Sequence, residues 1–473
     1  MPDQEETISG LDAIRVATGR KPAQHLGLLI AWSNAEPERI GEVALLTEGT
    51  AVTLGRGEGS GGPRARLVRQ RPGVNEPGGP LGGLGLSREQ LRIEARADAL
   101  DVTLTGKPPL ELRGVDVERC TLGVGDAVVV RGQLLLFCVK RPERLPPSRG
   151  FPADALAPFG RPDALGILGE APATWRLREQ VAFAAEAAGH VLILGESGVG
   201  KELSARAVHR LSARRDRALV ARNAATLPPG LIDAELFGHV RNYPNVGMPE
   251  RAGLVGEAHG GMLFLDEIAQ LPVDLQAHLL RVLDAGGEYQ RLGDAAARRS
   301  DFLLLAATNR DPSGLAHDFG ARFPLRIEVP PLRERACDVP LLVRHLLLRA
   351  CERSPALLER FVTTIDGSPH PRVDPALVLD LMTRSLPGNV RELDALLWRA
   401  LSESDGDAVL ALRERAEPAT PATPTAEPSA QQIRDALREQ AGSVTRAAAA
   451  LGLPSRFALY RLMKRLGLSS PEE

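Results

Sequence analysis

The sequence predicts a multidomain protein of three fold classes: an all-β sandwich, then an α/β domain, then an all-α helix-turn-helix. Short apolar runs separated by glycine- and proline-rich turns fill residues 25–140, which is typical of all-β domains. The apolar run Val191–Leu194 leads into a glycine-rich turn and a segment with few helix breakers, and this order of strand, turn and helix builds phosphate-binding loops. Near the C-terminus, apolar residues recur at helical spacing.

Composition and two proline-rich segments set the domain boundaries. The 473 residues are 43% apolar and 25% charged, which suffices for packed cores in several domains. The formal net charge is -2, so any contact with nucleic acid must come from a local basic patch. Repeated prolines predict linkers at 141–164 and 413–430. The predicted domains are therefore residues 25–140, 165–412 and 431–470.

The cysteines and the N-terminal residues predict a cytoplasmic chain. The four cysteines lack the spacing of a metal site and are expected to be reduced thiols. The first residues, MPDQEET, are acidic and lack the apolar segment of a signal peptide. No apolar run approaches the ~20 residues of a membrane span, so no membrane partner is expected.

The stretch GESGVGKE predicts a nucleotide-phosphate site. Its glycines let backbone N–H groups surround phosphate oxygens without Cβ clashes, and the following helix N-terminus adds a partial positive charge. Lys201 can reach the β- and γ-phosphates. The Ser or Thr that usually follows is Glu202 here, which removes one expected magnesium contact. The predicted cofactor-binding residues of this loop are Gly195, Glu196, Ser197, Gly198, Val199, Gly200, Lys201 and Glu202.

Polar residues follow two further strand-like runs. Asp266 and Glu267 come after Met262–Leu265, and Asn309 closely follows Phe302–Ala307. Open α/β sheets place their sites at the carboxyl ends of strands. We therefore expect Asp266 to hold Mg²⁺ through water, Glu267 to polarise the attacking water and Asn309 to sense the γ-phosphate. The alternative for the acidic pair is a solvated strand end. ATP and Mg²⁺ are the predicted cofactors.

Six motifs resemble the AAA+ core of bacterial sigma-54-dependent activators, the enhancer-binding proteins. They are GESGVGKE, AELFGH (Ala234–His239), AHGGMLFLDEI (Ala258–Ile268), AATNRD (Ala306–Asp311), PPLRER (Pro330–Arg335) and LPGNVREL (Leu386–Leu393). The resemblance implies an α/β ATPase subdomain at 165–334, a helical lid at 335–412, and a ring, usually a hexamer, with sites between subunits. It also implies that Asn223 restrains the catalytic Glu267 and that Arg391 is the sensor arginine of the lid.

Two segments depart from this family pattern. The family has two arginines ahead of PPLRER that reach into the neighbouring subunit's site. Here Arg322 aligns with the second, and the first falls near Ala316. One arginine finger can be worth ~10³–10⁵ in rate, so ATP hydrolysis is expected to be slow. The alternative for Arg322 is a surface salt bridge.

The second departure is the loop that reads GAFTGA in the family and contacts sigma-54. The equivalent here is Asn242–Gly247, in which Pro244 restricts the backbone. We expect the sigma-54 contact to be lost. The alternative is a binding loop with Tyr243 as its contact.

The C-terminal residues resemble a Fis-type helix-turn-helix. Gly452 can stop one helix and Ser455 can cap the next. Between Ser443 and Leu468 there are five basic residues and no acidic ones, which is the local patch that DNA binding needs. Leu459 is expected in the core. The alternative is a basic helical bundle without a DNA role. The predicted DNA-binding residues are Ser455, Arg456, Tyr460, Arg461, Lys464 and Arg465.

The N-terminal segments TLGRG, LSREQLRI and LGVGDAVVV resemble a forkhead-associated domain, a β-sandwich that binds phosphothreonine. The resemblance implies that Arg56, Ser87 and Arg88 bind phosphate, and arginine suits this because it gives bidentate contacts to phosphate oxygens. Gln90 replaces the usual histidine, and the insert Glu58–Gly85 is expected to be mobile. The alternative is a β-domain that binds protein without phosphate.

Together these features predict a DNA-binding transcription regulator with an ATP-binding AAA+ core that acts without sigma-54 and senses a phosphorylated partner. Two alternatives stay open: a functional sigma-54-dependent activator that couples ATP hydrolysis to open-complex formation, and a phosphopeptide-binding signalling adaptor with a decayed ATPase. The predicted partners are DNA, RNA polymerase holoenzyme, a phosphothreonine-containing protein, and further copies of the chain, from a dimer to a hexamer.

Overall fold

The computed structural model describes residues 23–58, 62–228, 230–284, 286–311, 314–412 and 430–440, together with Ala447, Leu451, Leu459 and Met463. The chain divides into two compact units between Ala411 and Leu412. The first unit holds the β-rich N-terminal domain and the α/β domain with its lid. None of the described helices has the length and apolarity needed to cross a bilayer.

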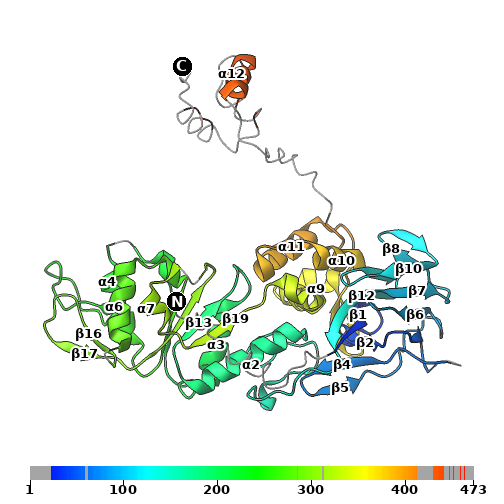
Figure 1. The fold of residues 1–473 in the computed structure, drawn as a ribbon, viewed down its shortest axis with the longest axis horizontal. Coiled ribbons are helices and arrows are strands. Elements are labelled where there is room, and N and C mark those ends of the chain that lie inside the picture. Colours follow the sequence, from blue (N-terminus) through cyan, green and yellow to red (C-terminus); the bar gives the residue numbers. More distant parts are fainter. Residues whose placement is uncertain are drawn as a thin grey trace, which may run out of the picture. The chain divides into compact units, whose positions relative to one another are not determined.

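Two antiparallel sheets form the N-terminal domain (Figure 1). One has the strand order β5-β4-β2-β1-β12-β11-β8-β9 and the other β10-β7-β6-β3. Leucine, isoleucine and valine side chains from both sheets share one core, and β6 shows why: its alternate residues Leu91, Ile93 and Ala95 are buried. The β-rich prediction is therefore confirmed. The strands are β1 Gln24–Ser33, β2 Val43–Leu46, β3 Ala51–Leu54, β4 Leu67–Arg71, β5 Val74–Pro77, β6 Leu91–Ala95, β7 Leu100–Leu104, β8 Leu110–Leu112, β9 Val115–Val117, β10 Arg119–Leu122, β11 Ala127–Val130 and β12 Leu134–Pro142, with a 3-10 helix η1 at Pro37–Arg39.

The insert between Glu58 and Gly85 contains a hairpin, so the expectation of a mobile insert is wrong for this part. Strand β4 pairs with β5 and also with β2, which extends the larger sheet. The strand was missed because it reads LVRQR, with two arginines. Their guanidinium groups lie 5.7 Å from the ring of Phe159, so an aromatic ring provides the packing.

The segment 141–164, expected to be a linker, packs against the following domain. Strand β12 continues to Pro142, and a short 3-10 helix, η2, covers Ala153–Ala155. Phe151 and Ala155 are buried in one cluster with residues of helix α2, Pro172–Ala187. The prolines keep this segment extended, while its few apolar side chains hold it in place.

A five-stranded parallel sheet of order β14-β15-β18-β13-β19 is the centre of the middle domain. Alternate residues of its strands pack on α2 and α3 on one face and on α4, α5, α6 and α7 on the other. The register sets Asn223 opposite Asp266 and Leu194 opposite Thr308, so the carboxyl ends of four strands meet at one edge. The bounds are β13 Val191–Leu194, α3 Lys201–Leu211, β14 Leu219–Asn223, η3 Ala224–Thr226, α4 Ile232–Phe237, α5 Gly253–Glu257, β15 Met262–Asp266, η4 Ile268–Gln270, α6 Val273–Asp284, β16 Glu288–Gln290, β17 Ala297–Arg299, β18 Leu303–Thr308, α7 His317–Gly320 and β19 Leu325–Glu328.

The lid is mainly helical, as predicted, but it also contains a two-stranded hairpin of β20 and β21. It begins with η6, a 3-10 helix with a kink at Arg335. Apolar residues along α8, among them Leu347, are buried. The lid elements are η6 Leu332–Asp338, α8 Val339–Cys351, α9 Pro355–Phe361, β20 Val362–Ile365, β21 Ser368–Pro371, α10 Pro375–Thr383 and α11 Asn389–Glu403.

The second unit is described only in part. Helix α12 covers Ala430–Glu439, and its buried Ile433 and Ala436 share a small core with Leu459 and Met463. The core position predicted for Leu459 is confirmed, since this side chain is fully buried. The predicted DNA-binding residues Ser455, Arg456, Tyr460, Arg461, Lys464 and Arg465 lie outside the described residues.

Candidate nucleotide-binding site

The predicted phosphate-binding loop (the P-loop, Gly195–Lys201) lies between strand β13 and helix α3. Gly200 precedes the helix with a left-handed backbone, φ 107°, which glycine adopts without strain. The free N–H groups of the first turn of α3 lie next to the loop, as at other phosphate-binding helix termini. Gly198 has no room for a side chain, because a Cβ there would lie 2.1 Å from the carbonyl oxygen of Gly388.

Lys201 and Glu267 bring their charged ends together at the carboxyl edge of the sheet. Lys201 Nζ lies 3.9 Å from Glu267 Oε1. The same Nζ donates to the carbonyl oxygens of Gly195 at 3.0 Å and Glu196 at 3.2 Å. Glu267 has φ 54° and ψ 43°, a conformation that is uncommon for residues other than glycine. Backbone strain of this kind concentrates at functional sites.

Asp266 and Glu267 offer the oxygen ligands that Mg²⁺ prefers. Asp266 ends β15, and its Oδ1 accepts a hydrogen bond from the Glu267 N–H at 3.0 Å. Glu267 Oε2 is buried and has no hydrogen-bond partner in the described part of the chain, which is costly unless a cation or water meets it. Mg²⁺ is commonly held by one or two carboxylates together with phosphates. The donor set therefore fits this ion.

The lid contacts the P-loop through side chains of η6 and α11. Arg391 Nη1 donates to Ser197 Oγ at 3.2 Å. Asn389 Nδ2 donates to Glu196 Oε2 at 3.1 Å and to the carbonyl oxygen of Ser197 at 3.1 Å. Arg333 forms an ion pair with Glu196. The hydrogen bond from Asn389, followed by the Arg333 guanidinium, lowers the pKa of Glu196. The predicted sensor arginine is thus at the loop.

Sequence reasoning missed Asn389 and Arg333, although both lie in motifs quoted for the family resemblance. The dipeptide Gly388-Asn389 was the available signal, because such pairs mark turns. Asn389 indeed has a left-handed backbone, φ 51°, and its Oδ1 accepts a hydrogen bond from the Leu332 N–H at 2.8 Å. It therefore joins the start of η6 to the start of α11.

Three predicted residues lie near this group without joining it. Asn223 Oδ1 accepts a hydrogen bond from the Ala225 N–H at 2.9 Å, and no hydrogen bond joins the described side chains of Asn223 and Glu267. Asn309 follows β18 and is exposed. Glu202 points along α3 and pairs with Arg206 at 2.6 Å.

Arg322 forms a salt bridge within its own chain. Its Nε lies 2.6 Å from Asp284 Oδ1, and its Nη2 donates to Asp284 Oδ2 at 3.1 Å. Both side chains are partly exposed. This geometry matches the salt-bridge alternative, and any role towards a second subunit would require this pair to open.

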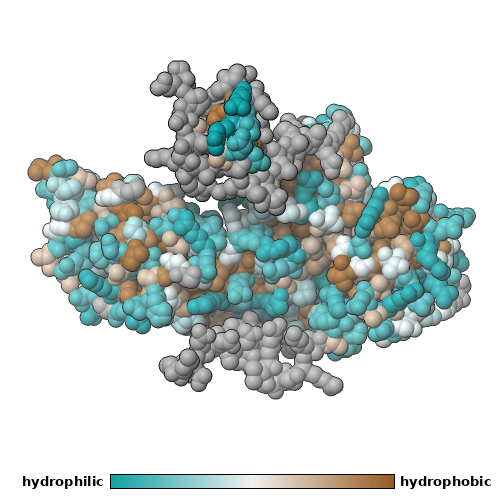
Figure 2. Space-filling model, turned by 45° about the horizontal axis from the view of Figure 1, so that its top comes forward, coloured by the Kyte–Doolittle hydropathy of each residue, from teal (hydrophilic) through white to brown (hydrophobic). Residues whose placement is uncertain are grey.

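The loop Asn242–Gly247, for which the sequence predicts a lost sigma-54 contact, is a closed turn. Asn242 Oδ1 accepts a hydrogen bond from the Gly247 N–H at 2.9 Å, and Asn242 N–H donates to the Met248 carbonyl at 2.9 Å. The Tyr243 ring packs against Gly293, where a Cβ would lie 2.6 Å from it. Val246, 93% exposed, is therefore the free tip. Figure 2 shows hydrophobic residues on the surface at the end of the middle domain that carries β16 and β17.

The predicted phosphopeptide residues lie together in the N-terminal domain. The Arg56 N–H donates to the Ser87 carbonyl at 2.9 Å, and the Lys107 N–H donates to Ser87 Oγ at 2.9 Å. Arg56, Arg88 and Lys107 form no ion pair with any described residue. The side-chain oxygen of Gln90 accepts a hydrogen bond from the Ser87 N–H at 3.1 Å and so supports this turn.

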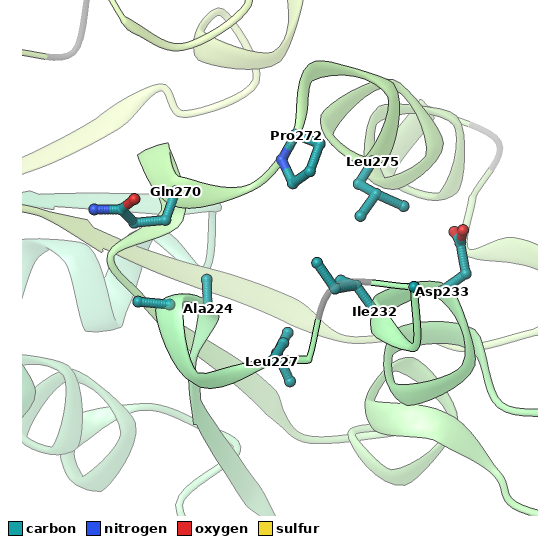
Figure 3. Close-up of a pocket in the computed structure, with 9 residues that line it drawn as sticks. Ala224, Leu227, Ile232, Asp233, Gln270, Pro272 and Leu275 are labelled. Atoms are coloured by element: carbon teal, nitrogen blue, oxygen red, sulfur yellow. The ribbon is translucent and has the colours of Figure 1, made fainter.

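A pocket of roughly 330 Å³ lies beside the strand ends and is distinct from the P-loop (Figure 3). Pro272 and Leu275 face Leu227 and Ile232 across it. Gln270, three residues after Glu267, lies at its rim. The pocket is mainly apolar and contains none of the predicted nucleotide-binding residues, so it does not contribute to the phosphate site.

The fold and the site define a P-loop domain of the AAA+ type with a helical lid. A family model described as the sigma-54 interaction domain matches residues 167–332. The transcriptional regulatory protein ZraR of Salmonella typhi is 35% identical over 319 residues, which cover 63% of this chain and 68% of ZraR. The chain belongs to this family of transcriptional regulators with a sigma-54 interaction domain.

Other relatives share the same central region. The formate hydrogenlyase transcriptional activator FhlA of Escherichia coli is 38% identical over 321 residues, which cover 64% of this chain and 44% of FhlA. The chain thus spans about half the length of such relatives. The crystal structure of NtrX from Brucella abortus in complex with ATP is similar with a TM-score of 0.46 and 28% identity, covering 63% of this chain and 69% of NtrX.

Proposed function

We propose that this protein is a cytoplasmic transcription regulator whose middle domain binds and hydrolyses ATP. The observation that carries the proposal is the approach of Lys201 to Glu267 at 3.9 Å beside a P-loop that the lid arginine Arg391 also contacts. Family membership supports the regulatory role, and the P-loop supports the nucleotide.

Each residue has a distinct task in the proposed reaction. Lys201 would leave the loop carbonyls to neutralise phosphate charge, and the N–H groups of the P-loop would hold the phosphate oxygens. Glu267 would orient the attacking water and accept its proton. Asp266 would hold Mg²⁺ through water, and this ion neutralises phosphate charge when bound. Arg391 would add a positive charge from the lid, and Asn309 would contact the terminal phosphate.

We further propose that regulation does not use sigma-54. Support comes from the Asn242–Gly247 turn, whose backbone is closed by its own hydrogen bonds and whose Tyr243 ring is packed on Gly293. The alternative is a sigma-54-dependent activator that couples ATP hydrolysis to open-complex formation, and the exposed Val246 favours it, since this side chain is free to contact a partner. Slow turnover is expected, because Arg322 is paired with Asp284.

The N-terminal domain would recognise the regulatory signal, and the C-terminal segment would bind DNA. We propose that the N-terminal domain has a forkhead-associated fold and binds a phosphothreonine-containing protein through Arg56, Ser87 and Arg88. The basic C-terminal segment would bind DNA as a Fis-type helix-turn-helix. Assembly from dimer to hexamer would add avidity to this small DNA-binding unit. A signalling adaptor with a decayed ATPase is disfavoured by the close approach of Lys201 and Glu267.

The decisive experiment combines nucleotide binding with transcription. The full chain is titrated with ATP, and Lys201→Ala is expected to abolish binding, whereas Lys140→Ala, on the exposed side of β12, should bind normally. Unchanged affinity in Lys201→Ala would refute the site. Reconstituted transcription then compares sigma-54 holoenzyme with housekeeping holoenzyme, with and without ATP. ATP-dependent stimulation confined to sigma-54 holoenzyme would favour the alternative.

A further inference from the structure

Two arginines of the N-terminal domain reach into the segments that flank the ATPase core. Arg71, in β4, donates from Nη2 to Glu170 Oε1 at 3.0 Å and to the Ala157 carbonyl at 2.9 Å. Arg141, in β12, donates from Nη2 to Cys337 Sγ at 3.1 Å. Glu170 precedes helix α2 and Cys337 lies in η6. The N-terminal domain therefore has polar contacts with both segments.

Glu170 is a buried charge that depends on Arg71. Its side chain is 4% exposed. Its other described contacts are the Gly160 N–H at 3.0 Å and Trp175 Nε1 at 3.2 Å, both neutral donors. The Arg71 guanidinium also lies 5.8 Å from the ring of Trp175. Removing one partner of a buried ion pair is strongly destabilising locally, because the other charge is left uncompensated.

The backbone that carries Glu170 is fixed to η6 by Asp338. This buried carboxylate accepts hydrogen bonds from the N–H groups of Glu170 at 2.7 Å and Ala171 at 2.8 Å, and from Thr174 Oγ1 at 2.5 Å. Asp338 is the last residue of η6. A shift of Glu170 would therefore displace this end of η6.

The same short helix holds the P-loop. Arg335, 5% exposed, donates from Nη2 to the carbonyl oxygen of Val199 at 3.1 Å. Arg333 pairs with Glu196. Both arginines lie in η6, three and five residues before Asp338. This helix therefore links the segment around Glu170, which Arg71 contacts, to the P-loop.

We infer that the N-terminal domain positions the P-loop through η6, with Arg71 and Arg141 as positioning residues. The inference rests on the proposed nucleotide site and adds to it a control that acts from outside the ATPase core. Coupling between sites is reciprocal, so a bound nucleotide also strengthens the docking of the N-terminal domain.

The test uses the full chain with Arg71→Ala and a matched control, Arg69→Ala. Arg69 lies on the same strand and the same distance, 5.7 Å, from the Phe159 ring, but it pairs with Glu42 of its own domain at 3.0 Å. Arg71→Ala should weaken binding of a fluorescent ADP analogue at least about fivefold. It should also speed amide hydrogen exchange at residues 195–200. Arg69→Ala should change neither.

Equal nucleotide affinity and equal P-loop exchange in the two variants would overturn the inference. If the unaltered chain binds no nucleotide, the proposed function fails, and the exchange measurement still tests the positioning. Arg71→Lys is the second variant, since lysine keeps the positive charge but loses the planar guanidinium that lies near the Phe159 and Trp175 rings. It should give a smaller change of the same sign, and no change at the P-loop would again overturn the inference.

Discussion

Glu267 combines three features that a residue acting on water needs. Its backbone is strained, one carboxylate oxygen is buried without a partner, and the other lies 3.9 Å from Lys201. We expect Glu267→Gln to keep nucleotide affinity and to lose ATP turnover by about 10²-fold or more, because the amide cannot accept the proton. Phosphate release measures this. Glu257→Gln, an exposed residue of α5, is the control, and equal turnover in the two variants would exclude the role of Glu267.

The Arg88 guanidinium in the N-terminal domain forms no ion pair with any described residue. We expect Arg88→Ala to lower the affinity for a phosphothreonine peptide about tenfold or more, since charge-assisted contacts to phosphate are lost. Arg92→Ala, exposed on β6, serves as the control. Calorimetric titration with phosphorylated and unphosphorylated peptides checks this. An unaltered chain that does not discriminate between the peptides would rule out phosphate recognition.

Site residues that belong to one short sequence motif were easier to predict than site residues that come together only in the fold. Lys201 follows directly from the P-loop, and Asp266 and Glu267 follow from an apolar strand. Asn389 lies 193 residues from Glu196, so no local pattern connects them. Asn223 and Arg322 were assigned by family alignment, and their hydrogen bonds to Ala225 and Asp284 depend on local geometry that alignment does not describe.

At the scale of secondary-structure elements, the contact between the P-loop and the lid can be tested by comparing alanine substitutions at two glycines. Gly198 and Gly260 have nearly the same left-handed backbone, φ 75° and φ 74°, so alanine is similarly strained at either position. A Cβ at Gly198 would lie 2.1 Å from the Gly388 carbonyl, whereas a Cβ at Gly260 would have nothing within 4 Å. The difference between the two variants therefore reports what a Cβ does in the P-loop and at its contact with the lid, beyond the backbone strain that both share.

We expect Gly198→Ala to push α11 away from the loop and to weaken ATP binding about tenfold or more relative to Gly260→Ala. Titration of both variants with ATP measures this, and thermal unfolding gives the strain that they share. Equal ATP affinities would show that the lid contact does not matter for binding.

Strands and helices were predictable to different degrees. The parallel sheet followed from continuous apolar runs such as Met262–Leu265, because central strands are buried on both faces. Strand β4 could not be predicted in this way. Its arginines pack on the ring of Phe159, and the strand therefore lacks the apolar run by which a strand is recognised in a sequence. The β20–β21 hairpin was also missed, because its strands have four residues each and β21 contains Pro369 and Pro371.

Across the first unit, a buried histidine lies where the N-terminal domain meets the lid. His370, in β21, lies 5.0 Å from the ring of Trp32, in β1, and neither of its ring nitrogens has a hydrogen-bond partner among the described residues. Burial, and then the charge of Arg344, lower the pKa of His370 to about 3 from the ordinary 6.5. The folded protein therefore keeps this ring neutral at pH 5, while the unfolded chain takes up a proton.

The stabilisation is complete above about pH 6.5 and is lost as the pH falls towards 3. Between pH 7 and pH 5 this one group should remove about 2 kcal/mol of the free energy of unfolding. His370→Phe keeps a ring without a titrating group, so its loss over the same range should be smaller by that amount. Urea unfolding at both pH values measures it. His317→Phe, at an exposed position, is the control, and identical pH slopes would disprove the assignment.

The pairing of β1 with β12 also fixes when the N-terminal domain can form during synthesis. Gln24 is paired with Pro142 and Ser33 with Leu134, so the centre of the larger sheet joins residues more than a hundred positions apart. Contacts of such long sequence separation form slowly. A nascent chain cannot complete this sheet before Pro142 has left the ribosome, and by then the segment carrying Phe151 follows immediately. The N-terminal sheet can therefore be complete before the residues on which Phe151 packs have been made, and a shortened N-terminal fragment should retain residues through Pro142 to fold.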